Sequence, residues 1–353
     1  MSTISRQSLL ESFEGHRNEL RLHCYRMLGS SHDTDDVLQE TALRAWRASA
    51  SLEDPDRVRA WLYRIASNVC LDELTHRRVR QLPYQAAPPA SADNLRIAPA
   101  EPEAWVEPCP AAWFDELTPD PAARYELQES VALAFVAALQ HLTPVQRAAL
   151  LLRDVVGLSA QETSAALSIG LEAANSALFR ARTALDSKLA GKVVVPRAAA
   201  SAAIEGVLAR YLAAWNQLDV EAFVALLHDE VRTTMPPSPT WLVGRSCNVE
   251  FYRPMFAAQR PGTFLAVPAR ANALAAFAFY RSVGGGEPHR LRAIQLVELR
   301  DEAVLSIDHF MLPELGRAFG LPSELEQTGV ATAITAQSCL ESAIDIANQK
   351  RPT

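Results

Sequence analysis

The segment His32–Trp46, with the sequence HDTDDVLQETALRAW, decides the first part of the fold. It predicts a helix, because Asp33 can cap the start and further acids in the first turn suit the positive end of the helix dipole. Apolar residues at helical spacing, from Leu38 to Trp46, form the side that faces a core. An acidic patch lies on the opposite side and consists of Asp35, Asp36, Gln39 and Glu40. Taken alone, this patch is more simply a solvated helix face.

A second helix is predicted over residues 61–74, WLYRIASNVCLDEL, and a cluster of arginines follows it. Its buried stripe runs from Leu62 to Val69 at helical spacing. The polar side chains on and after this helix are left to meet phosphates or bases; they are Arg64, Asn68, Arg77, Arg78 and Arg80. The alternative is that arginines at the end of a helix simply complement its dipole.

A helix-turn-helix is predicted between residues 143 and 189. Thr143–Gln146 and Ser159–Glu162 are capping boxes that begin helices. Ser168–Gly170 supplies the turn, and the second helix runs from Leu171 to about Leu189. The buried face of this helix follows the helical period and consists of Leu171, Ala174, Leu178, Ala181 and Leu185.

The other face of this helix carries side chains that suit a major groove. Asparagine, serine and arginine can bond base edges and phosphates, and an exposed phenylalanine can touch thymine methyl groups. The residues concerned are Asn175, Ser176, Phe179, Arg180 and Thr183, with Arg182 at the edge. An ordinary helical hairpin with a basic face is the alternative, because the motif is short.

Nine prolines predict a linker over residues 81–122, since such a stretch cannot hold a continuous helix. Inside the linker lies an island, Trp105–Pro110, which Trp113 and Phe114 follow closely. Plain linkers rarely carry two tryptophans so close together. The island is therefore either a local collapse onto a neighbouring domain or a docking segment.

The pattern changes from about residue 203 onward. One helix at about 202–227 precedes runs of alternating apolar and polar residues, which predict strands over 263–270, 274–281, 290–299 and 304–311. This order predicts an α+β domain with a curved antiparallel sheet. The alanine-rich tail, residues 323–353, is expected to be partly helical near 330–348.

The two helical blocks, in this order, strongly resemble regions 2 and 4 of the sigma-70 family factors, and more narrowly the extracytoplasmic-function (ECF) group. The resemblance assigns residues 8–80 to region 2, 81–122 to the linker and 123–190 to region 4. It implies that core RNA polymerase binds Asp35, Asp36, Gln39 and Glu40. It implies minus-10 promoter DNA contacts by Arg64, Asn68, Arg77 and Arg78. It implies minus-35 contacts by Asn175, Ser176, Phe179, Arg180 and Arg182.

The segment Tyr211–Asn216, YLAAWN, with the later Phe319–Pro322, FGLP, looks like the SnoaL-like cone, here over residues 203–322. Such a cone curves a sheet around an apolar pocket, which leaves room for a small ligand that the sequence does not identify. Some relatives of the cone are isomerases or cyclases that use an acid or a histidine as base, and the candidates here are Asp219, Asp308 and His309. We expect no enzyme, because this fold hosts many proteins without catalytic activity and fold alone does not give function.

ECF factors fused to this cone are a recognised subgroup, in which the cone is thought to regulate the factor in place of a separate anti-sigma protein. The resemblance implies that Trp105, Glu107 and Pro108 dock the linker, and that the cone packs against the linker and both sigma domains. The expected fold class is therefore multidomain. It has two all-α sigma domains, a region 2 helical bundle and a region 4 helix-turn-helix, and an α+β SnoaL-like cone.

Composition limits what such a chain can be. Its 353 residues carry a net charge of −7, whereas a protein that grips DNA alone is usually basic, so promoter binding would need the polymerase as a partner. No apolar run approaches the roughly 20 residues of a membrane span, and the charged N-terminus argues against export, so a cytoplasmic location is expected. Five widely spaced cysteines without a C-x-x-C pair argue against disulfides and a metal site. No cofactor is expected.

Two other classes of protein stay open. One is a SnoaL-type small-molecule isomerase or cyclase with a helical adaptor, and the other is a free-standing helix-turn-helix regulator. The acidic patch separates the sigma factor from the free-standing regulator, because only the sigma factor needs a polymerase-binding surface.

Overall fold

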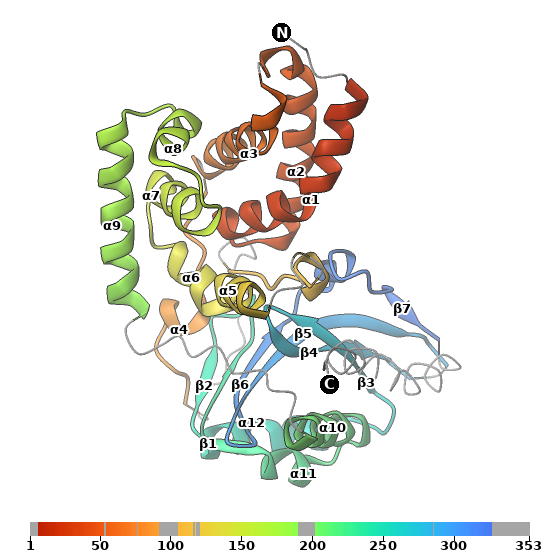
Figure 1. Cartoon of the computed structure of the whole chain (residues 1–353). Coiled ribbons are helices and arrows are strands. Elements are labelled where there is room, and N and C mark those ends of the chain that lie inside the picture. The colour runs from red at the N-terminus through yellow and green to blue at the C-terminus, as the bar shows by residue number, and fades with distance from the viewer. Residues whose placement is uncertain are drawn as a thin grey trace, which may run out of the picture. The chain divides into compact units, whose positions relative to one another are not determined.

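The chain forms two units, each with its own core (Figure 1). The computed structural model describes residues 6–52, 54–75, 77–91, 105–115, 117, 121–189, 202–284 and 286–326. The first unit comprises Met1–Gln81 and Glu103–Val195, and the second comprises Leu82–Pro102 and Pro196–Thr353. The proline-rich linker is therefore divided between the two units. The helix expected near 330–348 lies outside the described residues.

The first unit begins with three helices, α1 (Arg6–Leu28), α2 (Ser31–Arg47) and α3 (Val58–Leu74). The Ser30 hydroxyl caps α2 by accepting a hydrogen bond from the Asp33 amide at 3.1 Å. The prediction that Asp33 is the cap was therefore wrong, and its carboxylate binds arginines instead. Trp46 was predicted to face the core but is 38% exposed, with the Arg6 guanidinium over its ring.

The rest of the first unit is helical as well. Both predicted capping boxes are present, at Thr143 and Ser159, and they begin the helices as expected. Leu171 is 44% exposed against the prediction, because as the first residue of its helix it lies beyond the packed part. The helices are α5 (Pro121–Val131), α6 (Leu133–Leu139), α7 (Pro144–Leu150), a π-helical turn (Leu151–Val155), α8 (Ala160–Leu167) and α9 (Leu171–Leu189).

One apolar core runs through both helical blocks of this unit. Leu62 of α3, Leu151 after α7 and Leu178 of α9 belong to the same cluster of buried residues. Helix α3 packs against α8. The two blocks therefore meet beside Arg64 of α3, one of the residues predicted to contact minus-10 DNA. The two blocks were expected as separate domains, but in this structure they bury their apolar faces against each other.

Two buried arginines strengthen this contact between the blocks. The Arg147 guanidinium donates to the Met27 carbonyl of α1 and to Gln140 Oε1 at 2.6 Å. Arg26 of α1 donates to the Ser130 carbonyl at 3.0 Å and to its hydroxyl at 2.6 Å. Burial lowers the pKa of each arginine to about 10, so both keep their charge at neutral pH.

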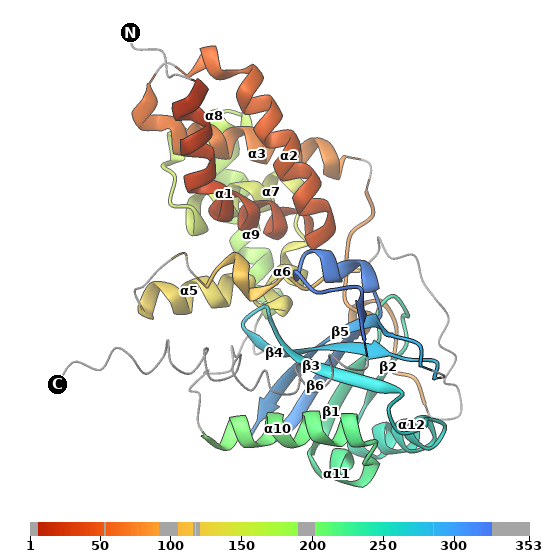
Figure 2. The same cartoon turned by 90° about the vertical axis from the view of Figure 1, so that its right-hand side faces the viewer.

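The second unit is an α+β cone, in which α10 packs against the sheet and α11 packs on α10 and α12 (Figure 2). The sheet order is β2-β1-β6-β5-β4-β3, with β7 paired to β5. The pair β1·β6 is parallel, so the sheet is mixed rather than wholly antiparallel. The strands are β1 (Leu227–Thr234), β2 (Trp241–Val243), β3 (Phe264–Ala271), β4 (Leu274–Arg281), β5 (His289–Arg300), β6 (Ala303–Phe310) and β7 (Glu324–Leu325). The helices are α10 (Ala202–Gln217), α11 (Val220–Ala225) and α12 (Arg245–Ala257).

Aromatic rings fill the core of the cone. Phe223 is fully buried between Tyr211, Trp215 and Tyr252, with ring centroids 4.6–5.6 Å apart. Asp219 caps α11 by accepting from the Ala222 amide at 2.9 Å. No helix in the described ranges is long and apolar enough to cross a bilayer.

Candidate functional site

The acidic patch predicted for polymerase binding lies on the outer side of α2. Asp36 and Gln39 are exposed, whereas Asp35 and Glu40 are half-buried. Asp35 lies 3.5 Å from the Arg21 guanidinium, and Glu40 accepts from Arg44 at 2.8 Å. The patch therefore offers two open polar side chains, flanked by two carboxylates that intramolecular ion pairs hold in place.

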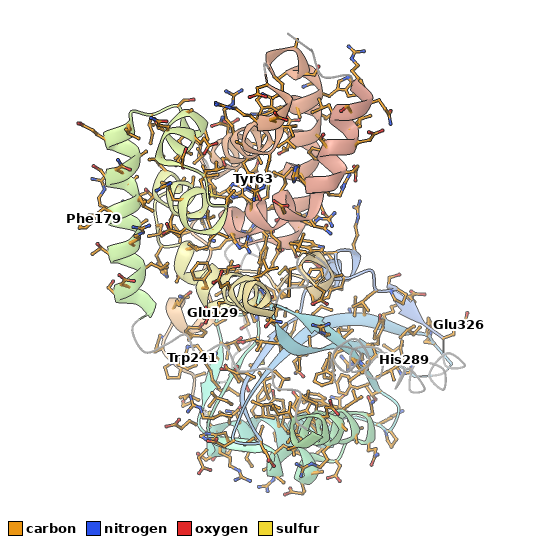
Figure 3. All side chains as sticks on the ribbon, in the orientation of Figure 1. Tyr63, Glu129, Phe179, Trp241, His289 and Glu326 are labelled. Atoms are coloured by element: carbon orange, nitrogen blue, oxygen red, sulfur yellow. The ribbon has the colours of Figure 1, made fainter. Side chains whose placement is uncertain are left out.

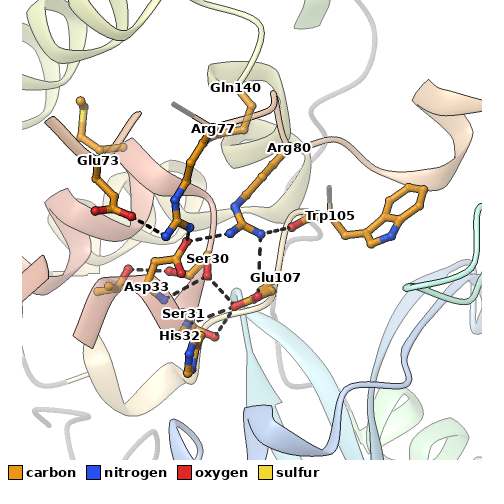
Figure 4. A network of polar contacts seen from close by, with 12 residues as sticks. Ser30, Ser31, His32, Asp33, Glu73, Arg77, Arg80, Trp105, Glu107 and Gln140 are labelled. Carbon is orange, nitrogen blue, oxygen red and sulfur yellow. Dashed lines mark hydrogen bonds and ion pairs between the residues drawn. The ribbon is translucent and has the colours of Figure 1, made fainter. Parts of the chain in front are cut away.

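Glu107 of the linker joins the start of this same helix (Figure 4). Its carboxylate accepts from the Ser30 hydroxyl at 2.9 Å, the Ser31 hydroxyl at 3.3 Å and the His32 amide at 3.1 Å. A carboxylate at this place satisfies free amides and complements the positive end of the dipole of α2. Tyr25 fixes the backbone of the same residue, because its hydroxyl donates to the Glu107 carbonyl at 2.8 Å.

The docking segment of the linker is buried throughout. Trp105, Glu107 and Pro108 are all buried, and the amide of Val106 donates to the Gln81 carbonyl at 3.1 Å. Trp113, 4% exposed, lies under the Arg21 guanidinium at 5.1 Å. Residues 105–115, in the second half of the linker, thus pack as a strap on the first helical block.

Two of the arginines after α3, Arg77 and Arg80, turn inward toward Asp33 (Figure 4). Arg80 is 4% exposed and binds the Asp33 carboxylate at 2.7 Å and the Trp105 carbonyl at 2.9 Å. Arg77 binds Asp33 and Glu73. Arg78 is exposed. Of the arginines predicted to meet minus-10 DNA, Arg77 is thus engaged within the protein in this structure.

Arg64 and Asn68 of α3 are half-buried, and helix α8 packs against α3. Arg64 lines a cavity of about 520 Å³ together with Arg57 before α3 and with Glu162 and Ala165 of α8. The hydrogen bonds of the Ser159 capping box lower the pKa of Glu162, so its carboxylate is charged at neutral pH. The predicted DNA-reading face of α3 is consequently partly covered.

The predicted reading face of α9 is open. Asn175, Ser176 and Arg180 are exposed, and Phe179 is 72% exposed (Figure 3). Arg182 is also exposed, but the Asp154 carboxylate binds it at 2.6 Å and raises its pKa. The opposite face packs through Ala174, Ala177, Leu178 and Ala181.

Residues 82–91, in the first half of the linker, pack on the cone. After the short helix α4 (Pro83–Ala86), the amide of Ala90 donates to the Trp241 carbonyl of β2 at 2.9 Å. The Trp241 indole donates back to the Ala87 carbonyl at 2.8 Å (Figure 3 labels Trp241). Arg232 lies 4.2 Å above the ring of Tyr84, and burial raises the pKa of that tyrosine to about 12. Sequence reasoning did not anticipate Tyr84, Arg232 or Trp241 as linker contacts.

The three candidate bases in the cone have different surroundings. Asp219 caps α11, and Asp308 accepts from the Thr234 hydroxyl at 2.7 Å. Of these three, only His309 lines the cavity of about 480 Å³ inside the cone, and no carboxylate of the described residues lines it. Burial lowers the pKa of His309 to about 4, so the ring is neutral at neutral pH. The two candidate carboxylates, Asp219 and Asp308, therefore lie outside the described lining of the cavity.

Three buried polar residues that join the helical blocks were also missed as functional residues: Arg26, Gln140 and Arg147. Arg147 directly follows the predicted capping box Thr143–Gln146, but no role was given to it. The available signal was an arginine directly before the apolar run Ala148–Leu152, because a charge so placed must be paired when it is buried.

Comparison with known families matches three segments of the chain. Residues 13–80 match sigma-70 region 2, residues 132–185 match sigma-70 region 4, and residues 208–307 match a SnoaL-like domain.

Relatives match over most of this chain. The chain is 36% identical over 312 residues to the ECF RNA polymerase sigma factor SigG of Mycobacterium tuberculosis, covering 88% of this chain and 83% of SigG. It is 28% identical over 225 residues to SigJ of the same organism, covering 64% of each. The crystal structure of SigJ matches with a TM-score of 0.56 at 23% identity, over 89% of this chain and 100% of that chain, which shows a shared fold. The chain therefore belongs to the extracytoplasmic-function sigma factors of the sigma-70 family, with a SnoaL-like C-terminal domain.

Proposed function

We propose that this sigma factor binds core RNA polymerase through the exposed acidic face of α2 and directs it to promoters from the cytoplasm, without catalysis of its own. In this proposal Asp35, Asp36, Gln39 and Glu40 contact the polymerase. Arg64, Asn68, Arg77 and Arg78 act at the minus-10 element, and Asn175, Ser176, Phe179, Arg180 and Arg182 act at the minus-35 element.

The open face of α9 is the observation that carries the proposal. Phe179 is 72% exposed between the exposed side chains of Asn175, Ser176 and Arg180, on a helix whose other face is packed. This combination of an amide, a guanidinium and an apolar ring suits base edges and thymine methyl groups in a major groove.

The compact first unit is, in our proposal, a resting form. The names of the two promoter elements place them about 25 base pairs apart, which is on the order of 85 Å along B-DNA. In the structure α3 packs against α8, and Arg64 shares a cavity with Glu162 and Ala165. Productive binding to both elements would therefore require α8 to leave α3.

The linker is the proposed route by which the cone regulates the factor. Its first half binds β2 through Trp241, and its second half places Glu107 at the start of α2, the helix with the acidic patch. In this proposal, a change at the cone reaches the polymerase-binding helix along the chain, because one linker attachment lies on the cone and the other lies on α2. Packing of the cone against both sigma domains stays a prediction.

In vitro transcription with core polymerase tests the main proposal. Asp36→Lys combined with Gln39→Lys should abolish transcription and polymerase capture, because it places two positive charges on the proposed polymerase-binding face. Both side chains are exposed, so their replacement should cost the fold little. Glu129→Lys, on α5 of the same unit, serves as the control for added charge. Full transcription by the double variant would remove α2 as the polymerase-binding surface.

A truncation that ends at residue 202 tests the regulatory part. If the cone restrains the factor through the linker, the truncated chain should differ from the full chain in transcription or in affinity for polymerase. Equal values for both chains would contradict regulation while leaving the sigma function intact.

A further inference from the structure

The cavity inside the cone has the size and lining of a small-molecule site. Its volume is about 480 Å³, which lies within the usual range for ligand pockets. Flat rings and sulfur-containing side chains form most of its wall, among them Trp215, Phe251, Phe279, Met255 and Met311. Such walls accept planar apolar rings, because aromatic faces stack and methionine adapts its shape.

A polar relay supplies one oriented hydrogen-bond donor to this cavity. The Tyr211 hydroxyl donates to Gln295 Oε1 at 2.6 Å, which turns the amide nitrogen of Gln295 toward His309 Nδ1 at 3.0 Å. Because an amide nitrogen only donates, Nδ1 must accept, and the neutral ring carries its proton on Nε2. Among the described residues no hydrogen bond engages Nε2, and the ring lines the cavity, so this N–H is available to a bound molecule.

Among the described residues, the charged members of the lining are both positive. They are Arg281 and Arg292, and no acidic residue of this part of the chain lines the cavity. Arg290 and Arg300 on the same strand as Arg292 form ion pairs with Glu324 and Glu230. Neither Arg281 nor Arg292 has an ion-pair partner in the part of the chain that the structure describes.

A β-bulge explains why Arg292 reaches the cavity. Phe279 pairs with Ala293 whereas Tyr280 pairs with Leu291, so Arg292 is the additional, unpaired residue of β5. In a regular strand Arg292 would lie on the face opposite to Gln295, because side chains alternate. A bulge changes the direction of a side chain, and here it brings a guanidinium to the wall that Gln295 also forms.

We propose that the cone binds a planar, ring-containing carboxylic acid. The carboxylate pairs with Arg281 and Arg292, the rings lie among the aromatic side chains, and an oxygen on the ring system accepts from His309 Nε2–H. This proposal deepens the regulatory role proposed above and rests on that role only for its effect on transcription.

Calorimetric titration of the full-length protein tests the binding. The probe is 6-hydroxy-2-naphthoate, which has a carboxylate and a distant oxygen on a bicyclic ring, and the matched neutral probe is its primary amide. We expect the acid to bind at least tenfold more tightly than the amide. Arg292→Gln should remove this preference, whereas Arg290→Gln, whose side chain pairs with Glu324, should keep it.

Three results would overturn the proposal: no heat of binding with the acid, equal affinity for acid and amide, or unchanged preference in Arg292→Gln. Arg292 is exposed, so its variant should fold, and circular dichroism checks this. Transcription is then measured with and without the probe. Binding without an effect on transcription would contradict regulation by the cone and leave the ligand site standing.

Discussion

Replacement of Glu107 by glutamine should release the second half of the linker from α2. Glu107 is 8% exposed, and its carboxylate accepts three hydrogen bonds at the start of α2. Hydrogen bonds to a charged group are worth about 1.5–3 kcal/mol, against about 0.5–1.5 kcal/mol for neutral ones. Glutamine also directs an amide donor at groups that donate. We therefore expect a loss of about 2 kcal/mol in docking, which is about a 30-fold change in the opening equilibrium.

Hydrogen exchange of the amides in residues 105–114 measures this opening directly. The amides of Val106 and Glu107 donate to Gln81 and Gly29, so release of the strap exposes both to solvent. Exchange in this segment should accelerate roughly 30-fold in Glu107→Gln. Glu129→Gln, in the same unit but outside the network, should leave it unchanged. Unaltered exchange in Glu107→Gln would refute the view that this carboxylate holds the linker.

Further changes probe the DNA-reading helix, the buried histidines and the core of the cone. Arg180→Ala should lower promoter discrimination by about 1–3 kcal/mol in competition binding by the holoenzyme, with no loss of thermal stability, because the side chain is exposed. Burial lowers the pKa of His309 to about 4 and that of His23 to about 3, below the ordinary 6.5. Because the unfolded chain binds these protons below pH 6.5 and the folded chain does not, the free energy of unfolding falls as the pH drops, by about 2 kcal/mol per histidine at pH 5. Urea unfolding at pH 7 and pH 5 should show this loss. His309→Gln should remove the part of the loss that belongs to one histidine. Phe223→Ala should cost about 3–5 kcal/mol in urea unfolding, because the ring is fully buried among other rings. A small cost would mean that the cone core tolerates the cavity.

Local patterns in the sequence determined most secondary structure and the family. The capping boxes at Thr143 and Ser159 begin their helices as predicted, because a cap and its partner lie only three residues apart. The strands β3 to β6 follow the predicted runs within one or two residues, since alternation is a local property. The open face of α9 was likewise predictable from the helical period, although Leu171 at its first turn was not.

Only the tertiary structure decided which groups meet across long distances in the chain. Asp33 was predicted as a cap, yet Arg80, 47 residues later, uses its carboxylate. The parallel pairing of β1 with β6 depends on the path of the whole domain, and alternation within a strand cannot show it.

Local sequence patterns thus determined two sigma regions, a proline-rich linker and a cone, because these patterns depend on residues close together in the chain. The shared core of the helical blocks, the two-sided attachment of the linker and the arginine that a bulge brings to the cone cavity were decided by folding. The physical reason is that buried charges and apolar faces need partners, and their identity depends on which distant segments the fold brings together.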